Sequence, residues 1–202
     1  VNGQLADIKS PNDAMHKYGI CLIPEDRKRE GCFLGETISW NLVYNVVKKI
    51  SHLGVVNRKK AKEIADYYGQ AMRIKAPDLD HTKVMTLSGG NQQKVVVAKW
   101  LMMSPKVLIV DEPTRGIDVG SKSEIYGLLS DLAKQGMAII VVSSEIEEIL
   151  GVCDSVVTIF EGKKTAQLEI NDQLTREEVL TAALGGNFSE AFMAGKGELR
   201  DE

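Results

Sequence analysis

The run KVLIVDEP, at residues 106–113, constrains the fold of this chain more than any other feature. Its uninterrupted aliphatic residues favour a strand that is buried on both faces, as in a parallel sheet. A similar run, YGICLIP, lies at residues 18–24, and another, MAIIVVSSE, lies at residues 137–145. Between KVLIVDEP and MAIIVVSSE, the segment GSKSEIYGLLSDLAKQG predicts a helix that Gly136 ends. Strands that alternate with helices predict a three-layer α/β domain with a mainly parallel sheet.

Composition narrows the class of protein without identifying it. The chain has 202 residues and a net charge of −3, which suits one globular domain with a small inserted lobe. This mild acidity argues against a nucleic-acid binder that works through its overall charge. Cys21, Cys32 and Cys153 lie far apart and form no CxxC pair, so we expect reduced thiols instead of a disulfide framework or a metal site. No run approaches the ~18 apolar residues that a membrane-spanning helix needs.

A helical stretch interrupts the alternation of strands and helices. The charged segment EDRKREG, residues 25–31, reads as a loop, and residues 34–85 then show helical spacing without a strand. Asn57 is a candidate helix cap and Pro77 a candidate helix end. Another helix is expected from Gly90 to about residue 103. We interpret residues 34–103 as an inserted helical lobe.

The C-terminal part predicts smaller elements. EIEEILGVC indicates a short helix, and SVVTIFEGKKTAQLE indicates a hairpin that turns at Glu161 and Gly162. TREEVLTAALGG predicts a helix with Thr175 as its cap. The tail after Gly186, residues 187–202, is expected to be flexible.

Two adjacent acids, Asp111 and Glu112, directly follow the central aliphatic run. The carboxyl ends of parallel strands are where open α/β sheets bind ligands. Asp111 is suited to hold Mg²⁺, directly or through water, and Glu112 is suited to orient and polarise an attacking water. A polar strand end with a turn at Pro113 explains the same residues without any ligand.

The segment LSGGNQQK places glycines directly before a predicted helix. Gly89 and Gly90 allow the backbone to approach a ligand closely, and the helix that follows offers unpaired N–H groups to a phosphate. Ser88 adds a hydroxyl donor. A helix start with ordinary capping is the alternative for this segment taken alone.

In combination, these segments resemble the ATP-binding cassette (ABC) ATPases, which belong to the P-loop NTPases. Residues 87–91 resemble their signature motif, with Asn91 where Gln is more usual. Residues 107–111 resemble the Walker B strand, and Glu112 its catalytic glutamate. Gly116, Ile117 and Asp118 resemble the D-loop. The resemblance covers nearly the whole chain to about residue 186.

Four segments narrow the resemblance: LSGGNQQK, DEPTRGIDVG, IPEDRKREG and VVSSEIEEIL. Together they resemble the second nucleotide-binding half of tandem bacterial ATPases that energise the import of ribose, galactose, xylose and related monosaccharides. The resemblance implies ATP and Mg²⁺ as cofactors. It also implies that Ser88, Gly89 and Gly90 close over the γ-phosphate of ATP held by the other half of the same polypeptide. Transmembrane permease subunits are the other expected partner, with a periplasmic or lipid-anchored sugar-binding protein as an indirect one. The expected location is the cytoplasmic face of the bacterial inner membrane.

This chain departs from the family pattern at three points. The phosphate loop, Walker A, is absent, so the resemblance predicts a chain truncated at its N-terminal side. Glu25 occupies the Q-loop position, where most cassettes have Gln; its carboxylate is suited to meet Mg²⁺ but donates no hydrogen bond. Ser144 occupies the position of the switch histidine, which predicts an impaired catalytic site in this half.

The resemblance divides the chain into four parts. Residues 1–33 would belong to the ATPase core with the Q-loop, and residues 34–103 to the helical signature subdomain. Residues 104–186 would complete the core with Walker B, D-loop and switch, ahead of the tail. In such a truncated core, apolar side chains on one strand face should be uncovered: Ile20, Leu22, Val107 and Ile109.

Three interpretations stay open. The chain is half of a sugar-importing ATPase, a soluble ABC ATPase of DNA repair or translation, or a non-hydrolysing half that completes and regulates its partner's site. The charged residues 26–30 either line a groove that receives a permease helix or form a solvated loop. The sequence does not specify the sugar.

Overall fold

A computed structural model describes residues 1, 3 and 5–186 of the chain. It divides the chain into two compact units, Val1–Val142 and Ser143–Glu202. The predicted flexible tail, residues 187–202, lies outside the described residues. No helix in the described part is long and apolar enough to cross a membrane.

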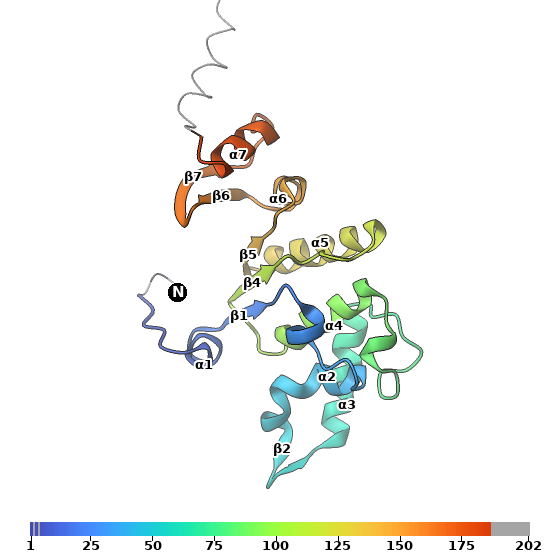
Figure 1. Ribbon diagram of the computed structural model, residues 1–202. Coiled ribbons are helices and arrows are strands. Elements are labelled where there is room, and N and C mark those ends of the chain that lie inside the picture. Colours follow the sequence, from blue (N-terminus) through green and yellow to red (C-terminus); the bar gives the residue numbers. More distant parts are fainter. Residues whose placement is uncertain (2, 4, 187–202) are drawn as a thin grey trace, which may run out of the picture. The chain divides into compact units, whose positions relative to one another are not determined.

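The first unit is built on a parallel sheet of three strands, seen in Figure 1 beside α5. Its order is β1 (Ile20–Ile23), β4 (Val107–Asp111) and β5 (Ala138–Val142), and all neighbours run parallel. These are the three aliphatic runs of the sequence. The predicted α/β class with a parallel sheet is therefore confirmed.

The two faces of this sheet differ in burial. Side chains at Cys21, Ile23, Leu108 and Val110 point to one face and are at most 1% exposed. On the other face, three side chains remain about half exposed: Leu22 at 48%, Ile140 at 52% and Val142 at 49%. Because side chains alternate along a strand, residues in register on neighbouring strands share a face, as Leu22, Ile109 and Ile140 do. The second face is thus apolar but only partly covered within the described residues.

Helix α4 (Gly89–Leu101) packs with the buried face of the sheet and is buried almost all round. Its polar residues Gln92, Gln93, Lys94 and Lys99 are each at most 6% exposed. Helix α5 (Val119–Lys134) packs beside it through its own buried side chains, Ile125, Leu129 and Leu132. Helix α4 is therefore the centre of the first unit.

Residues 34–88 are mainly helical, but the expectation of helices without a strand is wrong, and the division into an inserted lobe stays a prediction. A short hairpin, β2 (Ser51–His52) and β3 (Val55–Val56), interrupts this stretch. Its two turn residues, Leu53 and Gly54, have positive φ angles of 48° and 80°, the backbone of a tight two-residue hairpin turn. The rest is helical: α2 (Ile38–Val43), a 3₁₀ helix (Tyr44–Ile50), α3 (Arg58–Ala71) and a second 3₁₀ turn (Val84–Thr86).

Two boundaries differ from the sequence-based expectation. Helix α3 starts after Asn57, whose side chain accepts a hydrogen bond from the Lys60 N–H, as predicted. It ends at Ala71, six positions before Pro77, because Arg73 takes a left-handed conformation with φ of 50°. The proline therefore lies in the loop that follows and does not end the helix.

The charged segment after β1 is not the open loop that its composition predicts. Residues Arg27–Gly31 form a π-type helical turn. The Asp26 carboxylate caps it by accepting hydrogen bonds from the N–H groups of Lys28 and Arg29, at 3.0 and 3.1 Å. A side chain that satisfies the first N–H groups of a turn favours helix over loop. Before β1, α1 (Pro11–Asp13) continues into a second π-type turn (Ala14–Tyr18).

The second unit matches the sequence-based expectations closely. It contains α6 (Ile146–Val152), the antiparallel hairpin β6 (Ser155–Phe160) and β7 (Lys163–Glu169), and α7 (Arg176–Ala183). The hairpin turns at Glu161 and Gly162 as predicted, both with positive φ. Thr175 caps α7, and Glu178 completes a capping box with it.

The half-exposed sheet face predicts self-association of this chain in solution. Contiguous exposed apolar surface favours contact with another molecule. Replacing Leu22, Ile140 and Val142 together by threonine places a β-branched side chain, which suits a strand, at each position but removes apolar surface. We expect the sedimentation coefficient to rise with concentration for the original chain and much less for this triple variant.

The matched control is Val119→Thr, which alters an apolar residue that is 84% exposed on α5. We expect it to leave the concentration dependence unchanged. A chain that sediments as a monomer at every concentration would contradict the prediction.

Candidate functional site

Three of the predicted site residues lie at one edge of the parallel sheet. The pairing of Ile23 with Val110 places the residues that follow β1 and β4 at the same carboxyl edge. Glu25 follows β1, and Asp111 and Glu112 end and follow β4. The acids that the sequence analysis selected for metal and water chemistry thus follow neighbouring strands at the same edge of the sheet.

Glu112 has an unusual backbone. Its φ of 44° lies in the left-handed region, which a non-glycine residue adopts at an energetic cost. Its N–H donates to the carbonyl of Val142 at 2.8 Å, which fixes the backbone in this conformation. Such conformations cluster at functional sites, so the geometry favours a role for the Glu112 side chain beyond ending the strand.

The loop after β4 is anchored to helix α5. Thr114 is 1% exposed, and its hydroxyl hydrogen-bonds with the hydroxyl of Tyr126 at 2.9 Å. Asp118 is the N-cap of α5, with its carboxylate accepting from the Ser121 N–H at 2.9 Å. Hydrogen bonds from the Ser121 side chain and backbone hold the pKa of Asp118 below its ordinary value. Asp118 therefore has a capping role that the sequence analysis did not anticipate.

The signature-like turn begins helix α4. Ser88 is its N-cap and is exposed, while its Oγ accepts hydrogen bonds from both the backbone N–H and the side-chain amide of Asn91, at 3.4 and 3.0 Å. The Asn91 Oδ1 in turn accepts from the Lys75 N–H at 2.9 Å. Because the two bonds from Asn91 engage acceptor sites on the Ser88 oxygen, the hydroxyl proton of Ser88 can point outward. Asn91 thus orients the serine that the sequence analysis assigned to phosphate.

The two glycines of this turn have packing neighbours. A Cβ at Gly90 would lie 2.6 Å from both the Cβ and the Oγ of Ser121 on α5. A Cβ at Gly89 would lie 2.9 Å from a guanidinium nitrogen of Arg27 and 3.1 Å from the carbonyl oxygen of Gly116. The distances at Gly90 are too short for a side chain, so Gly90 is needed for packing as well as for the ligand approach that the sequence suggests. At Gly89 a side chain would have to displace the Arg27 guanidinium and shift the Gly116 carbonyl slightly.

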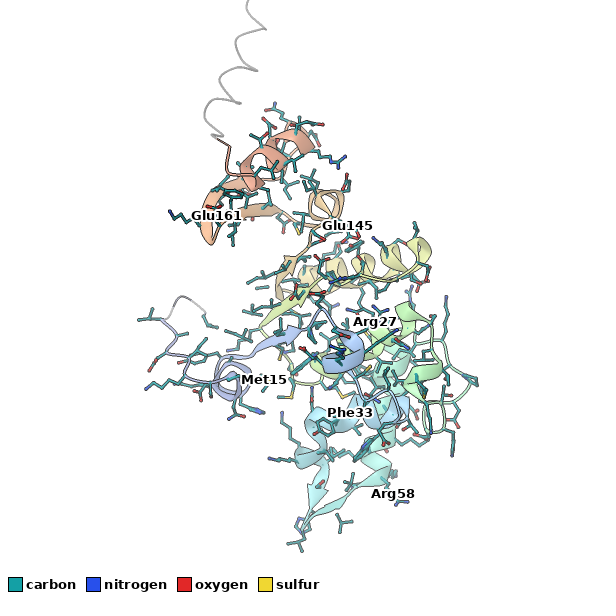
Figure 2. All side chains as sticks on the ribbon, viewed as in Figure 1. Met15, Arg27, Phe33, Arg58, Glu145 and Glu161 are labelled. Atoms are coloured by element: carbon teal, nitrogen blue, oxygen red, sulfur yellow. The ribbon has the colours of Figure 1, made fainter. Side chains whose placement is uncertain are left out.

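Two arginines that sequence reasoning did not select also lie at this site. The Arg27 guanidinium donates to the carbonyl oxygens of Arg115 and Gly116, at 2.6 and 3.0 Å. The Arg115 guanidinium makes an ion pair with Glu25. Figure 2 labels Arg27 in the turn that follows β1. The only signal in the sequence was the high density of charge at residues 25–31, which is equally typical of a solvated loop.

A buried lysine ties the helical lobe to α5. The Lys94 side chain is 6% exposed, and its Nζ donates to the Glu124 carboxylate at 2.5 Å and to the Arg73 carbonyl at 3.3 Å. Lys75 reaches the same carboxylate at 3.4 Å. The pKa of Glu124 lies below its ordinary value, mainly because Lys94 donates to it. A buried ammonium needs such partners, and they hold α4 and α5 in one register.

Ser144 lies in the second unit, two residues after β5 ends at Val142. It is exposed, while its neighbour Ser143 donates to Glu148 at 3.1 Å and accepts from the Glu145 N–H at 3.1 Å. The assignment of Ser144 to the switch position stays a prediction.

The Mg²⁺ assignment of Asp111 and Glu25 also stays a prediction. Within the described ranges no three His, Cys, Asp or Glu side chains form a metal-binding group. Two carboxylates nevertheless fit Mg²⁺, which proteins bind through one or two carboxylates together with substrate phosphates.

The fold is that of the ATP-binding cassettes. It resembles a dimeric ATP-binding cassette in a post-hydrolysis state bound to ADP and Pi, with a TM-score of 0.66 and 18% identity over 82% of this chain and 69% of that chain. It also resembles CbiO1 from Clostridium perfringens, part of the ABC transporter complex CbiONQ, with a TM-score of 0.66 and 24% identity over 94% and 72% of the two chains.

Sequence comparison shows the family. A family model described as ABC transporter matches residues 9–115, more than half of the 202 residues. The chain therefore belongs to the ABC transporter family of ATP-binding domains.

Curated relatives are longer than this chain. The ribose import ATP-binding protein RbsA of Geobacillus kaustophilus is 46% identical over 93% of this chain and 37% of its own length. The xylose import ATP-binding protein XylG of the same organism is 42% identical over 92% of this chain and 36% of its own length. A putative ribose/galactose/methyl galactoside import ATP-binding protein of Halalkalibacterium halodurans is 42% identical over 98% of this chain and 40% of its own length. The chain thus spans less than half the length of these relatives.

The contact between Gly90 and Ser121 makes a testable prediction. Gly90→Ala places a methyl group 2.6 Å from the Ser121 side chain, so α4 and α5 must move apart. We expect the variant to lose about 1–3 kcal/mol of unfolding free energy in urea titrations. Adding Ser121→Gly removes the clashing atoms, so Gly90→Ala should cost much less in that background.

Gly127→Ala is the matched control. Gly127 is also a helical glycine, on α5, and no atom lies within 4 Å of where its Cβ would be. The substitution should raise stability by about 0.5–1 kcal/mol, since alanine favours a helix interior over glycine. Equal losses for Gly90→Ala in both backgrounds would show that Gly90 and Ser121 are not in contact.

Proposed function

We propose that this chain is a nucleotide-binding half of an ATPase that powers monosaccharide import, and that it supplies its signature turn to ATP held by an adjoining cassette. The observation that carries the proposal is the exposed Ser88 hydroxyl at the N-terminus of α4, oriented by Asn91 and backed by two closely packed glycines. A hydroxyl donor beside unpaired N–H groups suits a phosphate. The turn and the acids at the end of β4 belong to the same compact unit.

The acids at the sheet edge suit the binding of Mg²⁺ and the orientation of the attacking water in ATP hydrolysis. Asp111 and Glu25 would hold Mg²⁺, which supplies positive charge to the phosphates when it is bound. Glu112 would accept a hydrogen bond from the attacking water. Its own backbone is fixed by the hydrogen bond from its N–H to the Val142 carbonyl. Arg115 would compete with Mg²⁺ for Glu25, because the two side chains form an ion pair.

The names of the relatives support sugar import over the alternative of a soluble ATPase of DNA repair or translation. Relatives at 42 to 46% identity are named ribose, xylose or ribose/galactose import proteins. The net charge of −3 gives no support to a nucleic-acid partner. We propose that the adjoining cassette lies on the same polypeptide and that the chain corresponds to the second cassette of such a tandem protein.

A surface beside the turn after β1 suits a permease. Phe33, Trp40 and Tyr44 are 42%, 38% and 45% exposed, and the rings of Phe33 and Tyr44 pack edge to face at 4.7 Å. The segment is held firmly, because the buried Lys99 ammonium donates to the Gly31 carbonyl at 2.9 Å. Exposed aromatic side chains on a fixed backbone are typical of protein interfaces. We propose that transmembrane subunits dock here, at the cytoplasmic face of the membrane, and that a sugar-binding protein acts through them.

A regulatory contribution is compatible with this proposal. Serine at position 144 has neither the reach nor the charge of a switch histidine, so the site made from this half's own acids would hydrolyse ATP poorly. This half would then act mainly by completing the site of the other cassette.

The two serines should behave oppositely in the full-length protein reconstituted with its membrane subunits. Ser88→Arg removes a hydroxyl donor to a charged phosphate, a bond of ~1.5–3 kcal/mol, and adds bulk at a close approach. We expect ATP turnover to fall at least ~100-fold. Ser144→Ala removes little that catalysis uses and should change turnover less than ~3-fold.

Steady-state ATP hydrolysis of both variants decides between the two sites. If Ser144→Ala abolishes turnover while Ser88→Arg is tolerated, the site assignment is reversed, and this half would contain the working hydrolytic site.

Nucleotide affinity gives a separate test on residues 1–202. They contain no phosphate loop, so the phosphates would lack the lysine and the amide cradle that bind them most strongly. We expect calorimetry with Mg-ATP to show binding no tighter than about 1 mM, roughly −4 kcal/mol. A micromolar dissociation constant would contradict this expectation.

A further inference from the structure

The charged turn after β1 contains one side chain that reaches across the sheet edge. Arg27 donates from Nη1 to the Arg115 carbonyl at 2.6 Å and from Nη2 to the Gly116 carbonyl at 3.0 Å. These partners lie 88 and 89 residues away in the sequence, in the loop between β4 and α5. The family motifs give this arginine no role, and the docking surface proposed at Phe33, Trp40 and Tyr44 does not include it.

The backbone of Arg27 is fixed from both sides. Asp26 caps the turn on the N-terminal side, through the Lys28 and Arg29 N–H groups. On the C-terminal side, the Arg27 carbonyl accepts from the Cys32 N–H at 3.0 Å and from its thiol at 3.3 Å. The guanidinium therefore extends from a rigid base, which favours positioning over transient contact.

The guanidinium also lies against the signature turn. Its Nη2 lies 2.9 Å from where a Cβ of Gly89 would be, and the Gly116 carbonyl lies 3.1 Å from the same point. Arg27 thus contacts the start of α4 and the loop after β4 simultaneously. Its Nε is buried and has no hydrogen-bond partner within the described residues, so the two terminal nitrogens alone hold the group.

The ion pair between Arg115 and Glu25 also joins these two loops, but it is weaker than the Arg27 hydrogen bonds. The two side chains are 67% and 43% exposed, and ion pairs that water reaches contribute little. The paired N–H groups of a planar guanidinium fix two carbonyls at once, which a lysine ammonium does not reproduce. Arg27 is therefore the residue that fixes the distance between the two loops.

We infer that Arg27 is a positioning residue, which holds the Arg115–Gly116 backbone against Gly89 so that the signature turn and the loop after β4 form one surface toward the adjoining nucleotide. The inference rests on the proposed function for its effect on catalysis. Its effect on the loop itself does not depend on that function. Because Arg27 does not touch nucleotide in this account, its loss lowers turnover more than affinity.

The experiment uses the full-length protein reconstituted with its membrane subunits. Arg27→Lys keeps the charge and the aliphatic stem but loses the paired hydrogen bonds. We expect kcat for ATP to fall about 10-fold while KM changes less than about 3-fold, because the reacting groups are misplaced and phosphate binding is retained. Arg58→Lys is the matched control, since Arg58 is exposed at the start of α3 and lies outside residues 26–30. It should leave both constants unchanged.

A double-mutant cycle tests the contact with Gly89. Gly89→Ala should displace the guanidinium in the original protein, so its effect on kcat should be smaller in the Arg27→Lys background. Multiplicative effects of the two changes would overturn the claimed contact. So would an Arg27→Lys variant whose kcat is unchanged, or whose KM rises as much as kcat falls.

Amide hydrogen exchange separates this inference from the proposed function. Arg27→Lys should speed exchange in residues 114–121 and leave the β6–β7 hairpin unchanged, whatever the protein's activity. If Ser88→Arg leaves turnover intact, the proposed function fails, and faster exchange would still support the loop contact. If Ser88→Arg abolishes turnover but Arg27→Lys alters neither kcat nor exchange, only the inference fails. Should Arg27→Lys not fold, Arg27→Gln, whose uncharged NH₂ group can donate to these carbonyls, is measured instead with the same expectations.

Discussion

The burial of helix α4 on nearly every side is the constraint on which the rest of the first unit depends. One face of a parallel sheet, two lobe helices and α5 all pack around it, so its polar side chains must find partners inside the protein. Lys94 finds Glu124 and the Arg73 carbonyl, and Lys99 finds the Gly31 carbonyl. Each of these bonds fixes another segment relative to the helix, because a buried charge without a partner would be costly.

The same helix determines where the proposed chemistry would occur. Its first turn carries Ser88 and two glycines, and the close contact of Gly90 with Ser121 leaves no freedom between α4 and α5. Helix α5 begins at the loop that follows the acids of β4. The proposed signature turn and the sheet edge therefore lie in one compact unit, and Arg27 contacts both the start of α4 and the loop after β4. The second unit has its own hairpin and helices and is a separate compact body.

Sequence patterns predicted the regular elements because their signals are local. Three aliphatic runs became the three strands, and Thr175 with Glu178 became a capping box. The hairpin at Leu53 was missed because its turn depends on a leucine with positive φ, which no local pattern favours. The contacts of Arg27 and the capping role of Asp118 were also missed. A charged residue in a loop reads as solvated unless its distant partners are known, and the partners of Arg27 are backbone carbonyls 88 and 89 residues away.

The central claim is that the turn at residues 87–91 faces the γ-phosphate of ATP bound by an adjoining cassette. An ATP analogue with a photoreactive group on the γ-phosphate tests it most directly, in the full-length protein reconstituted with its membrane subunits. After irradiation and proteolysis, mass spectrometry identifies the labelled peptides. Labelling within residues 87–91 that excess ATP suppresses is the predicted result. Labelling confined to other segments, with residues 87–91 unmodified while the protein hydrolyses ATP, would contradict the account.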